Sequence, residues 1–169
     1  PTGAINSQFS VGANSQVYIS QGNLQYIGSA ATPYWRFAEH QYDYFGTTTG
    51  QNSANANVDR DLFGWGTSGW NNGNTYYQPY NTDNIDGSLY GPVGSYNLTD
   101  SYANADWGVY NAISNGGNAA GLWRTLTKDE WVYLFNTRSA STVNGVSNAR
   151  YAKGTVAGVS GVILFPDIS

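Results

Sequence analysis

Cysteine is absent from this chain of 169 residues, and charged side chains are scarce. Without cysteine there are no disulfides, no thiolate metal ligands and no cysteine nucleophile, so stability has to come from packing. Charged residues make up 11% of the chain, against roughly 25% in an average soluble domain. The formal net charge of −4 leaves no basic face. Because phosphate backbones are held by clustered lysine and arginine, the sequence argues against a nucleic-acid partner.

Two further signals are missing. No apolar run approaches the roughly 20 residues that span a bilayer, so no membrane span is expected. The first residues, PTGAINSQ, have neither the basic start nor the apolar stretch of a signal peptide. If the protein is exported, its signal has been removed or left out.

Aromatic residues and glycine are abundant instead. Aromatics reach 15% of the chain, and the counts of tyrosine (14) and glycine (21) are high. Solubility then depends largely on uncharged polar groups, which is typical of exported proteins built from short strands and long polar loops. The length fits one domain with a real core. Composition therefore favours a single β-rich, extracellular domain.

Strands are expected in the first third of the chain. The stretch QFSVGANSQVYISQGNLQYIG alternates apolar and polar residues, which predicts two or three strands. The next aromatic stretch, PYWRFAEHQYDYFG, is interpreted as a strand followed by a short helical turn.

Five of the charged side chains gather between Gly116 and Arg138, where the sequence predicts a helix from about Lys128 to Asn136. Thr127 and Glu130 have the spacing of a capping box, and acidic residues in the first turn and Arg138 at the end suit the helix dipole. The apolar stripe expected to be buried against a sheet consists of Trp131, Leu134 and Phe135. A shorter helix is expected over residues 107–113, stopped by a pair of glycines.

The last thirty residues predict a β-hairpin. Residues 150–156 and 162–165 form its strands, with a glycine-containing turn at 157–161, and VNGV at 143–146 is a further turn signal. The apolar run GVILFP has the composition of a central strand buried on both faces. Such a strand needs neighbours on both edges, so we expect residues beyond 169 or a second polypeptide to close it.

The middle of the chain, residues 66–105, shows no lasting period and is interpreted as a long loop excursion. Seven tyrosines between Tyr76 and Tyr110 argue against disorder. Tyrosine gives a large amphipathic contact while asparagine, serine and glycine give adaptable hydrogen bonds, the chemistry of antibody loops, and aromatic rings also stack on sugars. The predicted ligand-binding residues are Trp70, Tyr76, Tyr77, Tyr80, Tyr90, Tyr96 and Tyr102. The alternative is that these tyrosines only pin the loop to its own domain.

The six tryptophans divide into two groups. Patterned segments predict that four of them lie in the core, and the other two are expected to be exposed. The expected core residues are Trp35, Trp107, Trp123 and Trp131. The expected exposed residues are Trp65 and Trp70.

A calcium site is one reading of NTDNIDGSLYG. Asp83, Asn84 and Asp86 offer hard oxygen ligands near a glycine, as calcium accepts, but the full EF-hand pattern is missing. The alternative is a plain loop closed by Asx turns.

Catalytic signals are weak. His40 lies beside Glu39 and Asp43, which suits a base or a metal ligand, but a single histidine without cysteine is more typical of a surface or structural residue. Asp59 and Asp61 could serve a glycosidase, yet salt bridges or turn caps are the simpler reading. The chain has no G-x-S-x-G elbow, so no hydrolase signature is present.

Six motifs carry a resemblance to a known group. In this order they are GNLQY, WRFAEHQYDYFG, DLFGWGTSG, DWGVYNAISNGGN, LWRTLTKDEWVYLFNTR and YAKGTVAGVSGVILFPD. This order resembles a large group of secreted or surface proteins of gut Bacteroidota. The group is similar to a branch of the C-type-lectin-like fold that includes formylglycine-generating enzymes and the variable proteins of diversity-generating retroelements. WRTLTKDEW resembles the helix start of the formylglycine-generating enzymes.

The resemblance implies an α+β chain with a C-type-lectin-like fold, made of short antiparallel strands, one or two helices and long irregular loops. Residues 1–169 would be a single domain, or its N-terminal portion, because relatives continue past GVILFPD. The copper-binding cysteines of the formylglycine-generating enzymes are missing here, which excludes that activity for this chain.

The expected function is a non-enzymatic, adhesin-like module that binds a protein or glycan on a cell surface, in the extracellular space or on a phage particle. The alternative is a structural subunit of a surface or phage assembly, completed by a second polypeptide. An enzyme acting on glycans is a third hypothesis.

Overall fold

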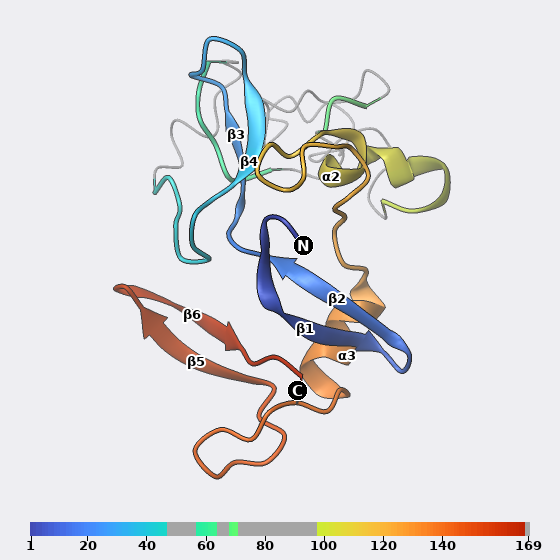
Figure 1. Cartoon of the computed structure of the whole chain (residues 1–169), viewed down its shortest axis with the longest axis vertical. Coiled ribbons are helices and arrows are strands. Elements are labelled where there is room, and N and C mark those ends of the chain that lie inside the picture. Colours follow the sequence, from blue (N-terminus) through green and yellow to red (C-terminus); the bar gives the residue numbers. More distant parts are fainter. Residues whose placement is uncertain (47–56, 64–67, 71–97, 168–169) are drawn as a thin grey trace, which may run out of the picture. The chain divides into compact units, whose positions relative to one another are not determined.

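The computed structural model describes residues 1–46, 57–63, 68–70 and 98–167 (Figure 1). Contacts divide the chain into two compact units. Unit 1 is built from Gly3–Ser20 and Leu126–Ser169 with Pro1, and unit 2 from Gln21–Thr125 with Thr2. The described residues form antiparallel two-stranded sheets and a few short helices, so the α+β class is confirmed.

Unit 1 begins with the hairpin of β1 (Ala4–Gly12) and β2 (Ser15–Ser20). Because side chains alternate along a strand, Phe9 and Val11 share one face of β1, and both are buried. They pack with Leu134 of helix α3 (Lys128–Asn136), which is fully buried. The core of unit 1 therefore lies between this hairpin and α3.

Helix α3 begins as its sequence predicts. The Thr127 hydroxyl accepts a hydrogen bond from the Glu130 amide at 3.2 Å, and the Glu130 carboxylate accepts one from the Thr127 amide at 2.8 Å. This is the predicted capping box, and it satisfies two amides that the helix itself leaves without a partner.

The cap gives a direct stability prediction. Thr127→Ala should lower the free energy of unfolding by roughly 1 kcal/mol, and Glu130→Ala by a fraction of that. Urea denaturation followed by far-ultraviolet circular dichroism measures both, with Thr127→Ser as the matched control because serine keeps the hydroxyl. Equal stability of Thr127→Ala and the wild type would contradict the role of the cap.

The buried stripe of α3 is narrower than predicted. Leu134 is fully buried, but Trp131 is 41% exposed and Phe135 is half-buried. The prediction that Trp131 belongs to the core is therefore wrong. Spacing shows which side chains share a helix face, but which of them are buried depends on what packs against α3. Trp131 instead stacks on Phe135, with ring centroids 5.9 Å apart.

A buried ion pair ties the end of α3 to the C-terminal segment. Arg138 has no exposed surface, and its guanidinium lies 3.1 Å from the carboxylate of Asp167. The same carboxylate accepts bonds from the Ser10 amide and hydroxyl and from the Gln16 side chain. Burial alone would raise the pKa of Asp167, but these hydrogen bonds outweigh it and the pKa is lowered.

The guanidinium also satisfies three carbonyl groups. It donates to the carbonyl oxygens of Leu134, Arg150 and Phe165. It lies 5.4 Å from the centroid of the Phe9 ring as well, in cation–π geometry. One side chain thus joins β1, the end of α3 and the open end of the following hairpin, opposite its turn. The sequence predicted only that Arg138 would suit the helix dipole.

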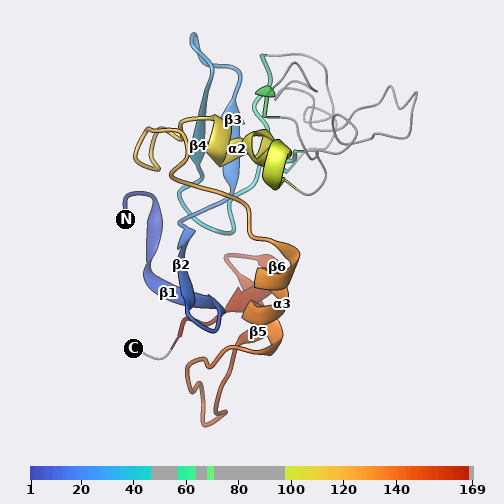
Figure 2. The same cartoon turned by 90° about the vertical axis from the view of Figure 1, so that its right-hand side faces the viewer.

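Strands β5 (Tyr151–Val156) and β6 (Val159–Leu164) form the predicted hairpin (Figure 2). Its turn is shorter than predicted, because Ala157 (φ 50°) and Gly158 (φ 81°) alone make it. Two left-handed residues in a two-residue loop match the twist of the strands. The predicted VNGV turn is confirmed by reciprocal backbone bonds between Val143 and Val146.

Among the described strands β6 pairs with β5 alone, and Val162 is 52% exposed. The second neighbour expected for residues 162–165, from residues beyond 169 or from a second polypeptide, therefore stays a prediction. An apolar run indicates a preference for burial, but the neighbours that bury it must come from elsewhere. The turn end of this hairpin extends away from α3 and β1 (Figure 1).

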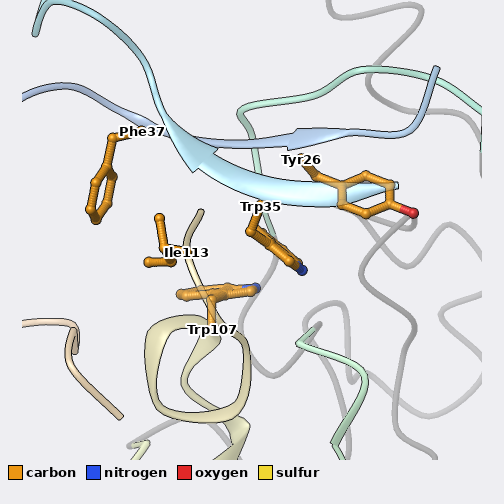
Figure 3. Packing of buried hydrophobic residues seen from close by; sticks show 5 residues of the cluster. All are labelled: Tyr26, Trp35, Phe37, Trp107 and Ile113. Carbon is orange, nitrogen blue, oxygen red and sulfur yellow. The ribbon is translucent and has the colours of Figure 1, made fainter. Parts of the chain in front are cut away.

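Unit 2 is built around the antiparallel pair β3 (Leu24–Ile27) and β4 (Tyr34–Phe37). Isolated bridges join Tyr26 to Arg60 and Trp35 to Ile113. Figure 3 shows Trp35 and Ile113 between the strands and Trp107. The buried cluster of unit 2 consists of Tyr26, Trp35, Phe37, Trp107 and Ile113.

Two short helices follow in unit 2, η3 (Asp100–Ala105) and α2 (Trp107–Tyr110). The helix expected over residues 107–113 is therefore shorter than predicted. The side chain of Asn115 forms two hydrogen bonds with the backbone of Phe37. Its oxygen accepts from the Phe37 N–H at 2.7 Å, and its nitrogen donates to the Phe37 carbonyl at 2.9 Å. Trp123 packs edge-on against Phe37, so it lies at the border of the core.

Candidate functional site

Two of the predicted ligand-binding residues, Trp70 and Tyr102, lie together in unit 2. Their ring centroids are 6.2 Å apart, and the planes meet at 84°. Both side chains are half-buried, so each keeps an accessible surface. They are separated by 32 positions in sequence, and tertiary structure therefore assembles this pair.

Trp70 is positioned by a buried serine. Ser68 is fully buried, and its carbonyl accepts a hydrogen bond of 2.9 Å from the Asn111 side chain, just after α2. The Ser68 hydroxyl in turn accepts a bond of 3.3 Å from the Trp70 amide. These two bonds link the backbone at Trp70 to α2, which is anchored in the core by Trp107.

Tyr102 is positioned by helix η3. Its amide donates to the Thr99 carbonyl at 2.9 Å, and Ala105 of the same helix is buried. Leu98, just before this turn, has φ 50° although its side chain packs against the core. A non-glycine residue in this region costs of order 1–2 kcal/mol, so packing of Leu98 has to offset the strain. Such strain is common at binding sites.

This arrangement gives the Trp70–Tyr102 pair the chemistry of a recognition surface. Ring faces accept the C–H face of a sugar or an apolar side chain, and the tyrosine hydroxyl and indole N–H offer hydrogen bonds. Tyrosine and tryptophan lose little entropy on binding because each has two rotatable side-chain torsions. The alternative is that the two rings only pin the loop to unit 2.

The other predicted binding and metal residues lie outside the described residues. They are Tyr76, Tyr77, Tyr80, Tyr90, Tyr96, Asp83, Asn84 and Asp86, and Trp65 lies outside as well. The calcium site therefore stays a prediction. Within the ranges that the structure describes, no group of three or more histidine and acidic side chains is placed to hold a metal ion.

The weak catalytic candidates have structural partners. Asp43 accepts a bond from the His40 amide at 2.8 Å and lies 3.2 Å from its ring nitrogen. Asp59 accepts from the Ser29 amide, and Asp61 accepts from the Phe45 amide. Both aspartates thus bond to backbone amides of distant segments, Asp59 across 30 positions and Asp61 across 16 positions of the sequence.

Asp106 is a buried carboxylate at the start of α2, with 4% of its surface exposed. It accepts bonds from the Thr125 amide at 2.6 Å and the Thr125 hydroxyl at 3.2 Å. Burial raises the pKa of Asp106, and the bonds from Thr125 oppose that shift. Both carboxylate oxygens have partners, so this group fastens Thr125 to the start of α2.

Sequence reasoning missed Ser68 and Asn111, the residues that position Trp70. They are 43 positions apart, and neither lies in a local pattern that carries a signal. A turn or a cap is visible in a sequence because its partners are neighbours, whereas a bond between distant residues depends on the whole fold.

Comparison of the chain with models of protein families, with curated proteins and with solved structures finds no match. Within the described part of the chain, no helix combines the length and apolar character needed to cross a membrane.

Proposed function

We propose that this protein is an extracellular, non-enzymatic module that binds a protein or glycan ligand through its tyrosine- and asparagine-rich segment. The proposed fold is C-type-lectin-like, and the proposed location is a cell surface, the extracellular space or a phage particle. The single observation that carries this proposal is the Trp70–Tyr102 contact, in which two half-buried rings from distant positions meet.

Three features support recognition rather than simple packing. The rings are held by backbone bonds to η3 and α2, so a ligand would meet a preorganised surface and lose less entropy on binding. Their type is the one enriched at binding hot spots. Leu98, four positions before Tyr102 in the sequence, holds a strained backbone conformation.

A glycan microarray probed with the labelled protein tests this function. We expect binding to a glycan class that falls about tenfold or more in Trp70→Ala and in Tyr102→Ala, because stacking rings dominate such sites. The matched control is Trp131→Ala, which removes an exposed tryptophan from unit 1. The same variants probed on an array of extracellular proteins cover the other ligand class.

Two results would contradict the proposed function. One is binding that both ring substitutions leave unchanged. The other is a wild-type protein that gives no stronger signal than Trp70→Ala for any ligand on either array. Circular dichroism of each variant checks that the fold is retained.

A second role, a structural subunit completed by another polypeptide, is favoured by a different observation. In unit 1 the strand β6 has one partner among the described strands, and exposed apolar side chains lie on and near its hairpin. Edges of this kind are sites of strand addition in assemblies.

A further inference from the structure

We propose that β6 is a dimer interface, at which a second copy of this chain adds its own β6 antiparallel about a two-fold axis at Val162. The two hairpins then form one four-stranded sheet. This inference rests on the second role proposed above, a subunit completed by another polypeptide, and it names that polypeptide as a copy of this chain. It does not depend on the ligand site in unit 2.

The register of the hairpin shows which backbone groups of β6 are available. The Phe165 amide donates to the Arg150 carbonyl at 3.0 Å, and Val162 lies opposite Lys153. In an antiparallel pair every second residue pair is hydrogen-bonded, so Ile163 bonds to β5 and Val162 does not. The N–H and C=O groups of Ser160 and Val162 therefore point away from β5, and a strand is the partner that matches them.

The side chains on this edge are apolar or small. Val162 and Leu164 are two residues apart on β6, so their side chains lie on the same face of the hairpin. Tyr151 lies opposite Leu164 and therefore shares that face with Val162. Tyr151 packs edge-on against Phe135, and Phe135 stacks on Trp131. Val162, Tyr151 and Trp131 are 52%, 46% and 41% exposed. An exposed face with apolar side chains at Val162, Tyr151 and Trp131 thus runs from the edge of β6 to α3, and it also carries Lys153, which lies opposite Val162.

The charged residues of the two strands favour β6 over β5 as the edge at which two copies pair. Strand β6 has the sequence VSGVIL and carries no charged side chain, so two copies meet there without repulsion. Strand β5 carries Lys153, the kind of residue that protects natural sheet edges from pairing. Two β5 edges would bring their lysines together. No proline or bulge interrupts the pairing of β6 with β5.

A second copy would also extend the two-stranded sheet to four strands. Two-stranded sheets are marginal by themselves, and further strands or a helix packed against them make them stable. A two-fold axis at Val162 pairs Ser160 of each copy with Leu164 of the other. It places the two Val162 side chains next to each other on the same face, where each covers the other.

Disulfide trapping tests this arrangement, because the natural chain has no cysteine. The two Val162 Cα atoms would lie about 5.5 Å apart, within the range that a disulfide spans. Val162→Cys in the full chain should form a covalent dimer under mild oxidation, at least tenfold faster than Val156→Cys. Val156 is the matched control, since it is 42% exposed on the same hairpin and its backbone groups point toward β6.

Sedimentation velocity gives the second arm. The wild type should show a monomer–dimer equilibrium that Val162→Lys shifts at least tenfold toward monomer, while Val156→Lys leaves it unchanged. Equal trapping of both cysteine variants, or a wild type that stays monomeric across the concentration range, would overturn the proposal. Glycan binding by a monomeric Val162→Lys variant would leave the ligand-binding role standing, so failures of the two ideas are distinguishable.

Discussion

Arg138→Met should destabilise unit 1 by about 3–5 kcal/mol, the usual cost of removing one partner from a buried ion pair. Methionine keeps most of the apolar stem but loses the guanidinium. Asp167, only 12% exposed, then loses its positive partner. The carbonyl groups of Leu134, Arg150 and Phe165 lose a donor at the same time. Unsatisfied buried acceptors add to the cost of the uncompensated charge.

Urea denaturation of the full chain measures this loss, and Arg124→Met is the matched control. Arg124 is exposed, so its substitution should change stability by about 0.5 kcal/mol or less. Asp167→Asn should lower the free energy of unfolding far less when it is added to Arg138→Met than when it is made in the wild type, because the two side chains act together. Additive costs would contradict the coupling between Arg138 and Asp167.

Trp35→Ala should destabilise unit 2 by about 3–5 kcal/mol, the range for removing a large aromatic side chain from a core. Trp35 is 5% exposed and lies near the rings of Tyr26 and Phe63, with centroids at 5.4 Å and 4.9 Å. Its loss leaves a cavity next to Trp107 and Ile113, which the short strands cannot close (Figure 3).

Trp131→Ala is the control of the same residue type, and we expect a loss of about 1 kcal/mol or less because that ring is 41% exposed. Thermal unfolding followed by circular dichroism ranks the two variants. A larger loss for Trp131→Ala than for Trp35→Ala would restore the prediction, made from spacing alone, that Trp131 is a core residue.

The parts of the fold that could be predicted from sequence are those with local causes. The cap of α3 depends on Thr127 and Glu130, three residues apart, and its bounds are those expected. The VNGV turn needs two left-handed residues, which Asn144 and Gly145 provide. The first strands follow from alternation, because a period of two is visible within a few residues.

The parts that could not be predicted depend on distant partners. Trp131 has the spacing of a buried residue, but whether it is buried depends on what packs against α3. The role of Arg138 rests on Asp167, 29 positions away. In the same way the apolar composition of β6 indicates a central strand, but it does not show which element would pair with the edge that β5 leaves open.

The candidate site follows the same division. Composition alone indicated a binding surface rich in aromatic rings, since residue type carries that signal. It did not show that Trp70 and Tyr102 meet, because their positions are set by Ser68, Asn111 and the turn at η3.

Mapping of a bound ligand by nitrogen-15 NMR tests the central claim most directly. The chain has six tryptophans, so its spectrum holds six indole N–H signals that single substitutions can assign. On addition of a glycan found on the array, we predict that the Trp70 signal shifts in proportion to bound ligand while the Trp131 signal of unit 1 stays in place. A ligand that shifts Trp131 and leaves Trp70 unmoved would contradict recognition through the Trp70–Tyr102 pair.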